Sequence, residues 1–190
     1  MRIASSVLSV AVLGASASAG LSSAMIDDFS GIPGLGFVRS ASGGASVAGG
    51  AGLLPAGGGF TWGGPDSGTN AYDASAFSGI SMKVTGALSG GELQISVFGS
   101  DYSSLLMNVN VSGNINASTG YLWVTFAELD ASDWGPVNWS SVGAIGFGLV
   151  GGTGSVQVDD LEFRSSAVIP APGALALVGM AGVARSRRRR

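Results

Sequence analysis

Five stretches of this chain alternate apolar and polar residues with a period of two, and this pattern constrains the fold more than any other feature. A strand that buries one face shows it, because successive side chains point to opposite faces of the sheet. Turn residues separate the stretches, and no segment has the spacing of an amphipathic helix. We therefore predict an all-β domain, an antiparallel β-sandwich. The residues expected to face its core are Ile80, Met82 and Val84; Leu93, Ile95 and Val97; Leu105, Met107, Val109 and Val111; Leu122, Val124 and Phe126; and Ile145, Phe147 and Leu149.

The last predicted strand changes parity in its middle. Val156 and Val158 share one face by spacing, whereas Leu161 and Phe163 share the other. Both pairs can be buried only if the strand bulges or twists between them. The change falls at residues 159–160, so we predict a β-bulge there.

Two pairs of adjacent carboxylates occupy similar positions, Asp27 and Asp28 near the start of the domain and Asp159 and Asp160 at the predicted bulge. If the first and last strands pair, all four carboxylates converge and need a counter-charge. Ca²⁺ takes about six to eight oxygen ligands, many of them carboxylates. We predict a structural Ca²⁺ site here; the alternative is that the aspartates end strands in solvent.

Glycine dominates residues 31–64 and interrupts every candidate element there. We expect short strands joined by long mobile loops. A phosphate-binding loop is the alternative, but the segment lacks Gly-x-x-x-x-Gly-Lys-Ser/Thr and no helix is predicted after it.

The N-terminus has the organisation of a secretory signal peptide. Arg2 gives a short positive region, an apolar stretch follows, and Ala17 and Ala19 supply small residues at the two positions that a signal peptidase reads. We predict cleavage after Ala19, with Ala24 as the alternative. The expected domains are 1–19, the signal peptide; 20–167, the β-sandwich; and 168–190, a C-terminal segment.

The C-terminal segment combines a proline pair, a short apolar run, which we expect to form a helix, and a basic end. Residues 173–184 give 12 apolar or small residues, or 17 counted from Val168, whereas a membrane span needs about 20. Arginines after the run resist translocation and favour a cytoplasmic end. The residues concerned are Pro170, Ala171, Pro172, Gly173, Arg185, Arg187, Arg188, Arg189 and Arg190.

These three elements in this order resemble the PEP-CTERM sorting signal of Gram-negative bacteria. The resemblance implies a transient inner-membrane anchor, cut by an exosortase-type enzyme, and a final location at the cell surface, outer membrane or outside the cell. Ala171 stands where the family motif has glutamate, which points to a variant subclass. A tail anchor that is never cut is the alternative.

Charge and composition restrict the function of the domain. All 12 acidic residues of the chain lie between Asp27 and Glu162, and the predicted domain, 20–167, holds three basic ones, Arg39, Lys83 and Arg164, so the domain carries a net charge of −9. An acidic surface argues against nucleic-acid binding. The chain has no cysteine and no histidine, which excludes disulfides, His-dependent nucleophile systems and Cys/His zinc sites.

Several segments resemble a galactose-binding-like jelly roll of the kind found in bacterial carbohydrate-binding modules. They are residues 26–29, 77–86, 123–126, 142–147 and 158–163, and the similarity covers about residues 25 to 165. The resemblance implies a jelly-roll sandwich, often a structural Ca²⁺, and in some members β-glucan binding in a concave face. The glycine-rich segment at 31–64 departs from the pattern.

Three functions follow in order of preference. The first is a non-catalytic cell-surface or matrix protein, and the second is a polysaccharide-binding module that uses exposed Trp134, Trp139 and Tyr102. For these aromatics the alternative is structural: Trp62 and Trp123 fill the core, and Trp134 and Trp139 cover its edge. The third is a small glycosidase, which would need paired carboxylates such as those of Glu128, Asp130 and Asp133.

Overall fold

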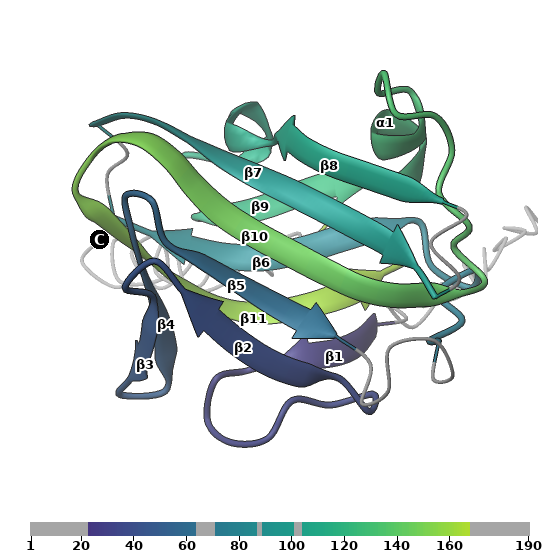
Figure 1. Ribbon diagram of the computed structural model, residues 1–190, viewed down its shortest axis with the longest axis horizontal. Helices are drawn as coiled ribbons and strands as arrows, with labels where there is room; N and C mark the ends of the chain where they lie inside the picture. Colours follow the sequence, from purple (N-terminus) through teal and green to yellow (C-terminus); the bar gives the residue numbers. More distant parts are fainter. Residues whose placement is uncertain (1–22, 64–70, 87–88, 101–103, 168–190) are drawn as a thin grey trace, which may run out of the picture.

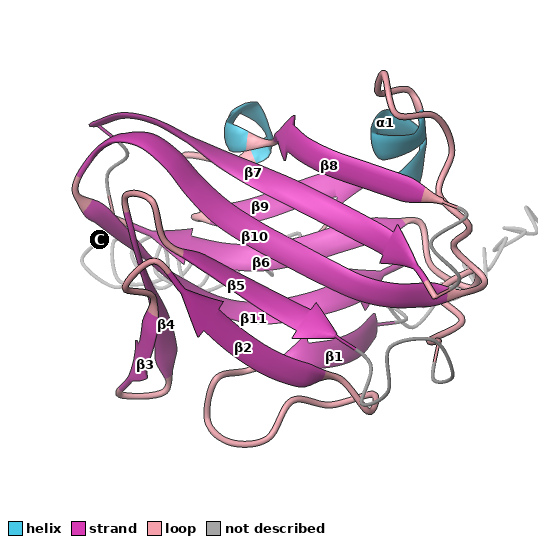
Figure 2. Ribbon diagram, viewed as in Figure 1, coloured by secondary structure: helices cyan, strands magenta, loops and turns pink. Residues whose placement is uncertain are grey.

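The computed structural model describes residues 23–63, 71–86, 89–100 and 104–167, which form two antiparallel sheets packed face to face. The predicted β-sandwich is thus confirmed (Figures 1 and 2). The strands are β1 (Ser23–Asp27), β2 (Val38–Ser42), β3 (Ser46–Ala48), β4 (Ala51–Pro55), β5 (Gly59–Gly63), β6 (Gly79–Thr85), β7 (Ser89–Gly99), β8 (Leu105–Asn110), β9 (Tyr121–Thr125), β10 (Val142–Thr153) and β11 (Ser155–Arg164).

One sheet, here called sheet A, has the order β3-β4-β11-β6-β9, and β1 pairs with β11 beyond the end of β4. The other, sheet B, has the order β2-β5-β10-β7-β8. Strand β9 therefore forms one edge of sheet A. The first and last strands of the domain are neighbours, with Ser23 opposite Arg164, so both ends of the described domain leave it at the same place.

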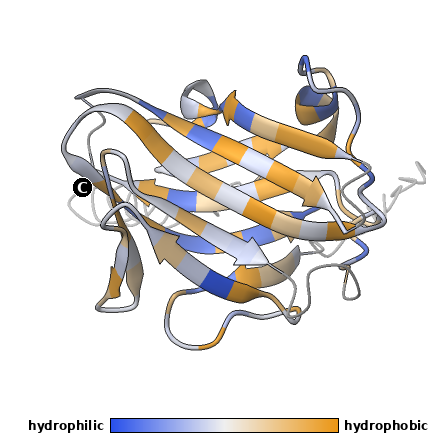
Figure 3. Ribbon diagram, viewed as in Figure 1, coloured by the Kyte–Doolittle hydropathy of each residue, from blue (hydrophilic) through white to orange (hydrophobic). Residues whose placement is uncertain are grey.

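Apolar side chains between the two sheets form the core, and the alternation of apolar residues along the strands is visible in Figure 3. The predicted inward residues of β6, β7, β9 and β10 are all at most 8% exposed, together with Phe126, which follows β9. Strand β8 differs from the prediction. Its inward residue is Leu106, while Leu105 and Met107 are only partly buried.

A β-bulge explains the error in β8. Two residues, Met107 and Asn108, stand opposite one residue of β7 in the pairing, and Asn108 has a φ of 56°. The extra residue reverses the parity, so that Leu106 lies inside before the bulge and Val111 lies inside after it.

The parity change in β11 marks the bulge that the sequence predicts. The register between β11 and β6 shifts between Asp159 and Glu162, and Asp160 has a φ of 49°. Val156, Val158, Leu161 and Phe163 all end in the core as a result, each at most 1% exposed.

The glycine-rich segment is more regular than expected. From Val38 to Gly63 it forms four strands, so the expected short strands are present but the long loops between them are not. The turn between β3 and β4 shows why glycine is needed there, because Gly49 and Gly50 have φ values of 62° and 77°. Such values suit a two-residue hairpin turn and are costly for other residues.

Helical structure is scarce among the described residues, for which the sequence predicts no amphipathic helix; the predicted C-terminal helix lies outside them. A 3₁₀ helix, η1 (Ser112–Asn114), follows β8, and a single turn of α-helix, α1 (Phe126–Asp130), follows β9. None of the helices in the described ranges could cross a membrane. The predicted signal peptide, at 1–19, and the C-terminal segment, at 168–190, lie outside the described residues.

Candidate functional site

The outer face of the edge strand β9 carries two aromatic side chains. Leu122 and Val124 point into the core, so the alternation of the strand places Tyr121 and Trp123 on the opposite, outward face. Their positions along the strand differ by about 6.6 Å, two residues at about 3.3 Å each. Both side chains are partly exposed.

Trp123 rests on the neighbouring strand β6. Its Cη2 atom lies 2.9 Å from the position that a Cβ on Gly79 would take, so the indole covers that glycine. Its cross-strand partner, Ser81, is fully buried, and the Ser81 hydroxyl has no hydrogen-bond partner. A fixed aromatic ring thus stands beside an unused hydroxyl group.

The loop between β8 and β9 forms a wall beside these aromatic residues. Ile115 makes an isolated β-bridge with Leu122. Asn116 shapes the turn that follows, because its side-chain oxygen accepts hydrogen bonds from the backbone N–H groups of Ser118 and Thr119, at 2.9 and 3.3 Å. The Asn116 carbonyl oxygen accepts from the N–H of Gly120 at 2.8 Å. The loop is therefore held by its own polar groups.

A pocket of about 240 Å³ opens between this loop and the outer face of β9. Aromatic, amide and hydroxyl groups line it together. Within the described residues, the side-chain oxygen of Asn114 and the side-chain nitrogen of Asn116 have no hydrogen-bond partner. The lining residues are Gly113, Asn114, Ile115, Asn116, Thr119, Tyr121, Trp123 and Ala167.

Two carboxylates accept hydrogen bonds from residues that line the pocket. The Tyr121 hydroxyl donates a hydrogen bond to Asp160 Oδ2 at 3.2 Å, and Asn114 Nδ2 donates to Glu128 Oε1 at 3.4 Å. Burial raises the pKa of Tyr121, and the negative charge of Asp160 raises it further. The pocket thus combines aromatic faces with a negative electrostatic environment.

The aromatic residues predicted to bind a ligand have different surroundings. Trp134 is 53% exposed, in the loop after α1. Trp139 stacks on Phe126 with ring centroids 3.7 Å apart, and its Nε1 donates to Asp130 Oδ1 at 3.0 Å. That stacked face of Trp139 is closed to a ligand. Tyr102 lies outside the described residues.

Trp62 fills the core, as the structural alternative expects, with 0% exposure, whereas Trp123 does not. That expectation was wrong for Trp123, because its side chain lies on the outward face of β9 and is partly exposed. The alternation that places Leu122 and Val124 inside also places Tyr121 and Trp123 outside. This signal was available in the sequence and identifies the two residues that were missed.

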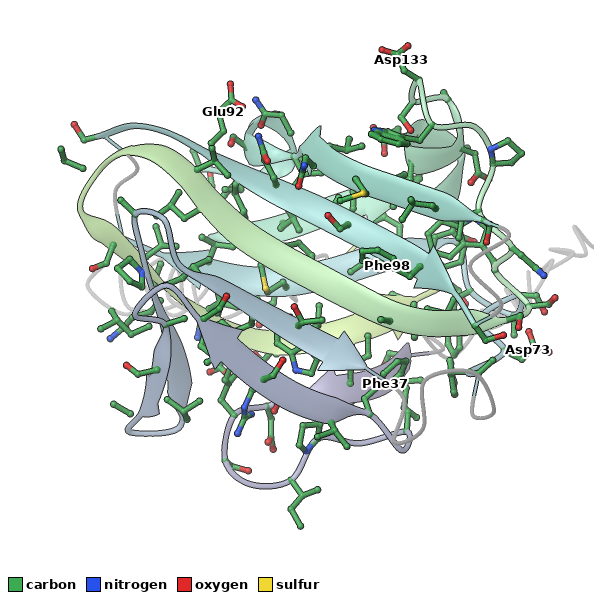
Figure 4. The ribbon with its side chains drawn as sticks, in the orientation of Figure 1. Phe37, Asp73, Glu92, Phe98 and Asp133 are labelled. Carbon is green, nitrogen blue, oxygen red and sulfur yellow. The ribbon has the colours of Figure 1, made fainter. Side chains whose placement is uncertain are left out.

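Two of the three carboxylates considered for glycoside hydrolysis hold local structure. Glu128 Oε2 accepts hydrogen bonds from the backbone N–H and the hydroxyl of Thr125, both at 2.7 Å, in the capping box of α1. Asp130 Oδ1 accepts from the Val137 N–H at 2.9 Å as well as from Trp139. Asp133 lies at the tip of the next loop and points away from the domain (Figure 4).

The predicted calcium ligands separate into an inner and an outer group. Asp27 is 1% exposed and forms an ion pair with Arg39, so its charge is already neutralised. Asp28 is exposed and accepts hydrogen bonds from Ser30, which lower its pKa. The expectation that all four carboxylates lack a counter-charge is therefore wrong for Asp27.

The outer aspartates lie near one another. Burial raises the pKa of Asp159, and the charges of Asp160 and Asp28 raise it as well. Among the described residues, no three acidic side chains are grouped closely enough to hold a metal ion. The residues as they stand do not form a complete calcium site, and the site stays a prediction.

The residues of the predicted sorting signal and signal-peptide cleavage site lie outside the described residues. The described part of the chain ends at residue 167, just before the C-terminal segment. Ala167, the last residue of the predicted domain, lines the pocket beside β9.

No protein-family model matches the chain, and no curated protein sequence matches it. Solved structures of carbohydrate-binding modules are similar in shape. The family 11 module of a cellulosomal cellulase from Clostridium thermocellum has a TM-score of 0.47 and 16% identity, over 79% of this chain and 98% of that one. A variant of a family 29 module, complexed with mannohexaose, has a TM-score of 0.45 and 17% identity, over 79% and 99%. The ligand of this chain has to be argued from its own residues.

Proposed function

We propose that this protein is a non-catalytic, polysaccharide-binding module and that the pocket beside β9 is its binding site. The observation that carries the proposal is the pair Tyr121 and Trp123, which share the outer face of one strand and open onto a pocket lined with amides. The sequence also suggests polysaccharide binding, but through Trp134, Trp139 and Tyr102. The site proposed here uses Tyr121 and Trp123 in their place.

The chemistry of the pocket suits a sugar ring. A pyranose has apolar C–H faces, which pack on aromatic rings, and an equatorial rim of hydroxyl groups. An amide has donor and acceptor groups side by side and can therefore bind hydroxyl groups in both senses. Asn114 and Asn116 supply such groups at the pocket wall. Ligand sites in general combine an apolar surface with a few placed polar groups.

The size of the pocket supports a polymeric ligand. Sites for whole drug-sized molecules enclose about 300 to 1,000 Å³, and this pocket has about 240 Å³. A pocket of this size takes one unit of a longer chain, with neighbouring units outside it.

The test compares two tryptophan variants of the full chain, kept in solution with a detergent that contains no sugar. Cellohexaose and mannohexaose serve as probes in isothermal titration calorimetry. We expect Trp123→Ala to weaken binding about tenfold or more, which corresponds to about 1.4 kcal/mol. Trp123→Phe keeps an aromatic face and should retain part of the affinity.

Trp134→Ala is the matched control, because Trp134 is the exposed tryptophan outside the pocket. We expect it to bind as the unmodified protein does. Loss of binding in Trp134→Ala with normal binding in Trp123→Ala would overturn the proposed site. Absence of binding to glycans of every type tested would overturn the function.

We further propose that the protein is exported and sorted to the cell surface. The support is the order of elements at the two ends of the sequence: a signal peptide at 1–19 and a PEP-CTERM-like segment at 168–190, which an exosortase-type enzyme would process. The pairing of Ser23 with Arg164 is compatible with this, because a surface domain could then be held or released at one end.

A bound Ca²⁺ remains part of the proposal as a structural ion. Asp28 and Asp159 are the carboxylates available to it, while Asp27 is paired with Arg39 and Asp160 is bonded to Tyr121. Backbone carbonyls and water would have to supply most of the remaining oxygen ligands.

A further inference from the structure

Two carboxylates accept hydrogen bonds from polar residues that line the pocket beside β9, called the β9 pocket below. Neither carboxylate has a cationic partner among the described residues. Asp160 accepts a hydrogen bond from the Tyr121 hydroxyl, and Glu128 accepts a hydrogen bond from the side chain of Asn114. The ion pairs of the described residues are Arg39 with Asp27 and Arg164 with Glu162, and neither includes Asp160 or Glu128. Neither carboxylate is therefore neutralised by an ion pair within the described residues.

The cations of the domain do not offset them. The described residues include three basic side chains, and two of these, Arg39 and Arg164, form the ion pairs just named. The third, Lys83, stands in register between Tyr121 and Asp159 on the outer face of sheet A, and its charge lowers the pKa of Asp159. Lys83 is thus shared with a further carboxylate.

The net charge of the described side chains around the pocket is negative. The carboxylates of Asp159, Asp160 and Glu128 outnumber the single ammonium group, that of Lys83. Charges at a partly enclosed, low-dielectric surface interact more strongly than charges in bulk water, and they concentrate ligands of opposite charge. Burial together with the charge of Asp160 raises the pKa of the Tyr121 hydroxyl, which agrees with a negative potential at the pocket wall.

We infer that the β9 pocket selects glycans that carry protonated amines, such as polymers of glucosamine, over neutral glycans and over polyuronates. This inference rests on the proposed function, because it assigns a ligand class to the same site. The aromatic faces of Tyr121 and Trp123 bind the ring in all three types of glycan. The carboxylates distinguish them by charge.

The experiment compares three hexamers with the same backbone: the glucosamine hexamer of chitosan, cellohexaose, and cellohexaose oxidised to the carboxylate at C6. The full chain is titrated at a mildly acidic pH, at which the amines are protonated. We expect the amine hexamer to bind about three to ten times more tightly than cellohexaose, the effect of one or two partly exposed charge pairs. The uronate hexamer should bind more weakly than cellohexaose.

Salt and two variants test the cause. The advantage of the amine hexamer should shrink when the ionic strength is raised, because salt screens exposed charges. Asp160→Asn keeps an acceptor oxygen but removes a charge, so it should lower the ratio of amine to neutral affinity. Asp73→Asn is the matched control, since Asp73 is exposed and, among the described residues, bonded only to Ser75 of its own loop. This variant should leave the ratio of amine to neutral affinity unchanged.

The outcomes separate the two proposals. If the amine hexamer and cellohexaose bind with equal affinity, the selection by charge is overturned. If Trp123→Ala then loses binding of both hexamers, the proposed binding site is still supported. If none of the three hexamers binds, both the binding function and the inference fail.

Discussion

The indole Nε1 of Trp62 donates a hydrogen bond to Asp27 Oδ2 at 2.6 Å, and this contact joins β5 of sheet B to β1 of sheet A. Arg39 completes the arrangement, because its Nη1 atom lies 2.7 Å from Oδ1 and 2.5 Å from Oδ2 of the same carboxylate. The Arg39 guanidinium also lies over the Phe29 ring, 5.0 Å from its centroid. One buried carboxylate thus connects the two sheets.

Asp27→Ala should therefore destabilise the fold strongly. It leaves the Arg39 charge and the Trp62 N–H without their partner, and breaking a buried ion pair in this way costs about 3–5 kcal/mol. The free energy of unfolding in urea measures the loss. Asp28→Ala is the control next to it, because Asp28 is exposed and its loss should lower the free energy of unfolding far less than the loss of Asp27. Equal stability of the two variants would contradict the structural role of Asp27.

The capping box of α1 gives a prediction about pH. The backbone and side-chain hydrogen bonds from Thr125 lower the pKa of Glu128 below its ordinary value of 4.5. A carboxyl group whose pKa is lowered on folding stabilises the fold above its unfolded pKa, and this contribution is lost as pH falls through the folded pKa.

Glu128→Gln should accordingly melt at a lower temperature than the unmodified protein near neutral pH, and the two melting curves should approach each other well below pH 4.5. Thr125→Ala should cost about 1 kcal/mol, because it removes the side-chain oxygen that caps the helix. A difference between Glu128→Gln and the unmodified protein that stays constant with pH would contradict the role of the charge.

The sequence predicts much of the sandwich because one buried face per strand leaves a period-two pattern. The bulge at 159–160 could be predicted because Val158 and Leu161 are both apolar and differ in parity. The bulge at Asn108 could not, since Leu105, Met107, Val109 and Val111 alternate perfectly, and only the pairing with β7 shows that Leu106 lies inside.

The candidate site was harder to predict for a different reason. The alternation of β9 places Tyr121 and Trp123 outside, but a pocket also needs a second wall. That wall is the loop around Asn116, whose position depends on the bridge between Ile115 and Leu122. The charged neighbour of Tyr121 is Asp160, 39 positions away in the sequence. Contacts over that distance leave no local pattern.

The contribution of Asp159 to the stability of the fold should depend on pH in the opposite sense to that of Glu128. Burial raises the pKa of Asp159 above 3.8, so the folded state binds more protons and loses stability as pH rises above that value. Asp159→Asn removes the charge, and its amide oxygen can still accept from the Asp160 N–H. The variant should melt at a higher temperature near neutral pH and at the same temperature below pH 3.8.

Asp73→Asn is a useful contrast for this measurement. Hydrogen bonds from Ser75 lower the pKa of Asp73, so the same substitution should lower the melting temperature near neutral pH. A shift of the same sign in both variants would mean that net charge, and not the surroundings of Asp159, controls the effect.

The calcium prediction is tested by thermal melts of the full chain in millimolar Ca²⁺ and in chelator. A metal that binds only the folded state stabilises it by about 2.7 kcal/mol at a hundredfold excess over its dissociation constant. The gain should disappear in Asp159→Asn and persist in Asp73→Asn. Coincident melts of the unmodified protein in the two solutions would leave Asp28 and Asp159 without a metal role.

Processing at both ends of the chain is the last prediction, and it lies in residues that the structure does not describe. We expect the mature protein at the cell surface to begin after Ala19 and to end near residues 170–172, because the apolar run of 12 to 17 residues is short of the about 20 that a stable span needs. Mass spectrometry of the mature protein measures both ends.

Removal of Arg185 to Arg190 tests why the C-terminal segment stops in the membrane. These residues carry five positive charges that resist translocation. Without them, the chain should pass through the membrane and escape cleavage. Replacing the same arginines with lysines is the matched control, because it keeps the charge and should keep the processing. If mature protein at the cell surface still carries Arg190, the C-terminal segment is a permanent tail anchor and not a sorting signal.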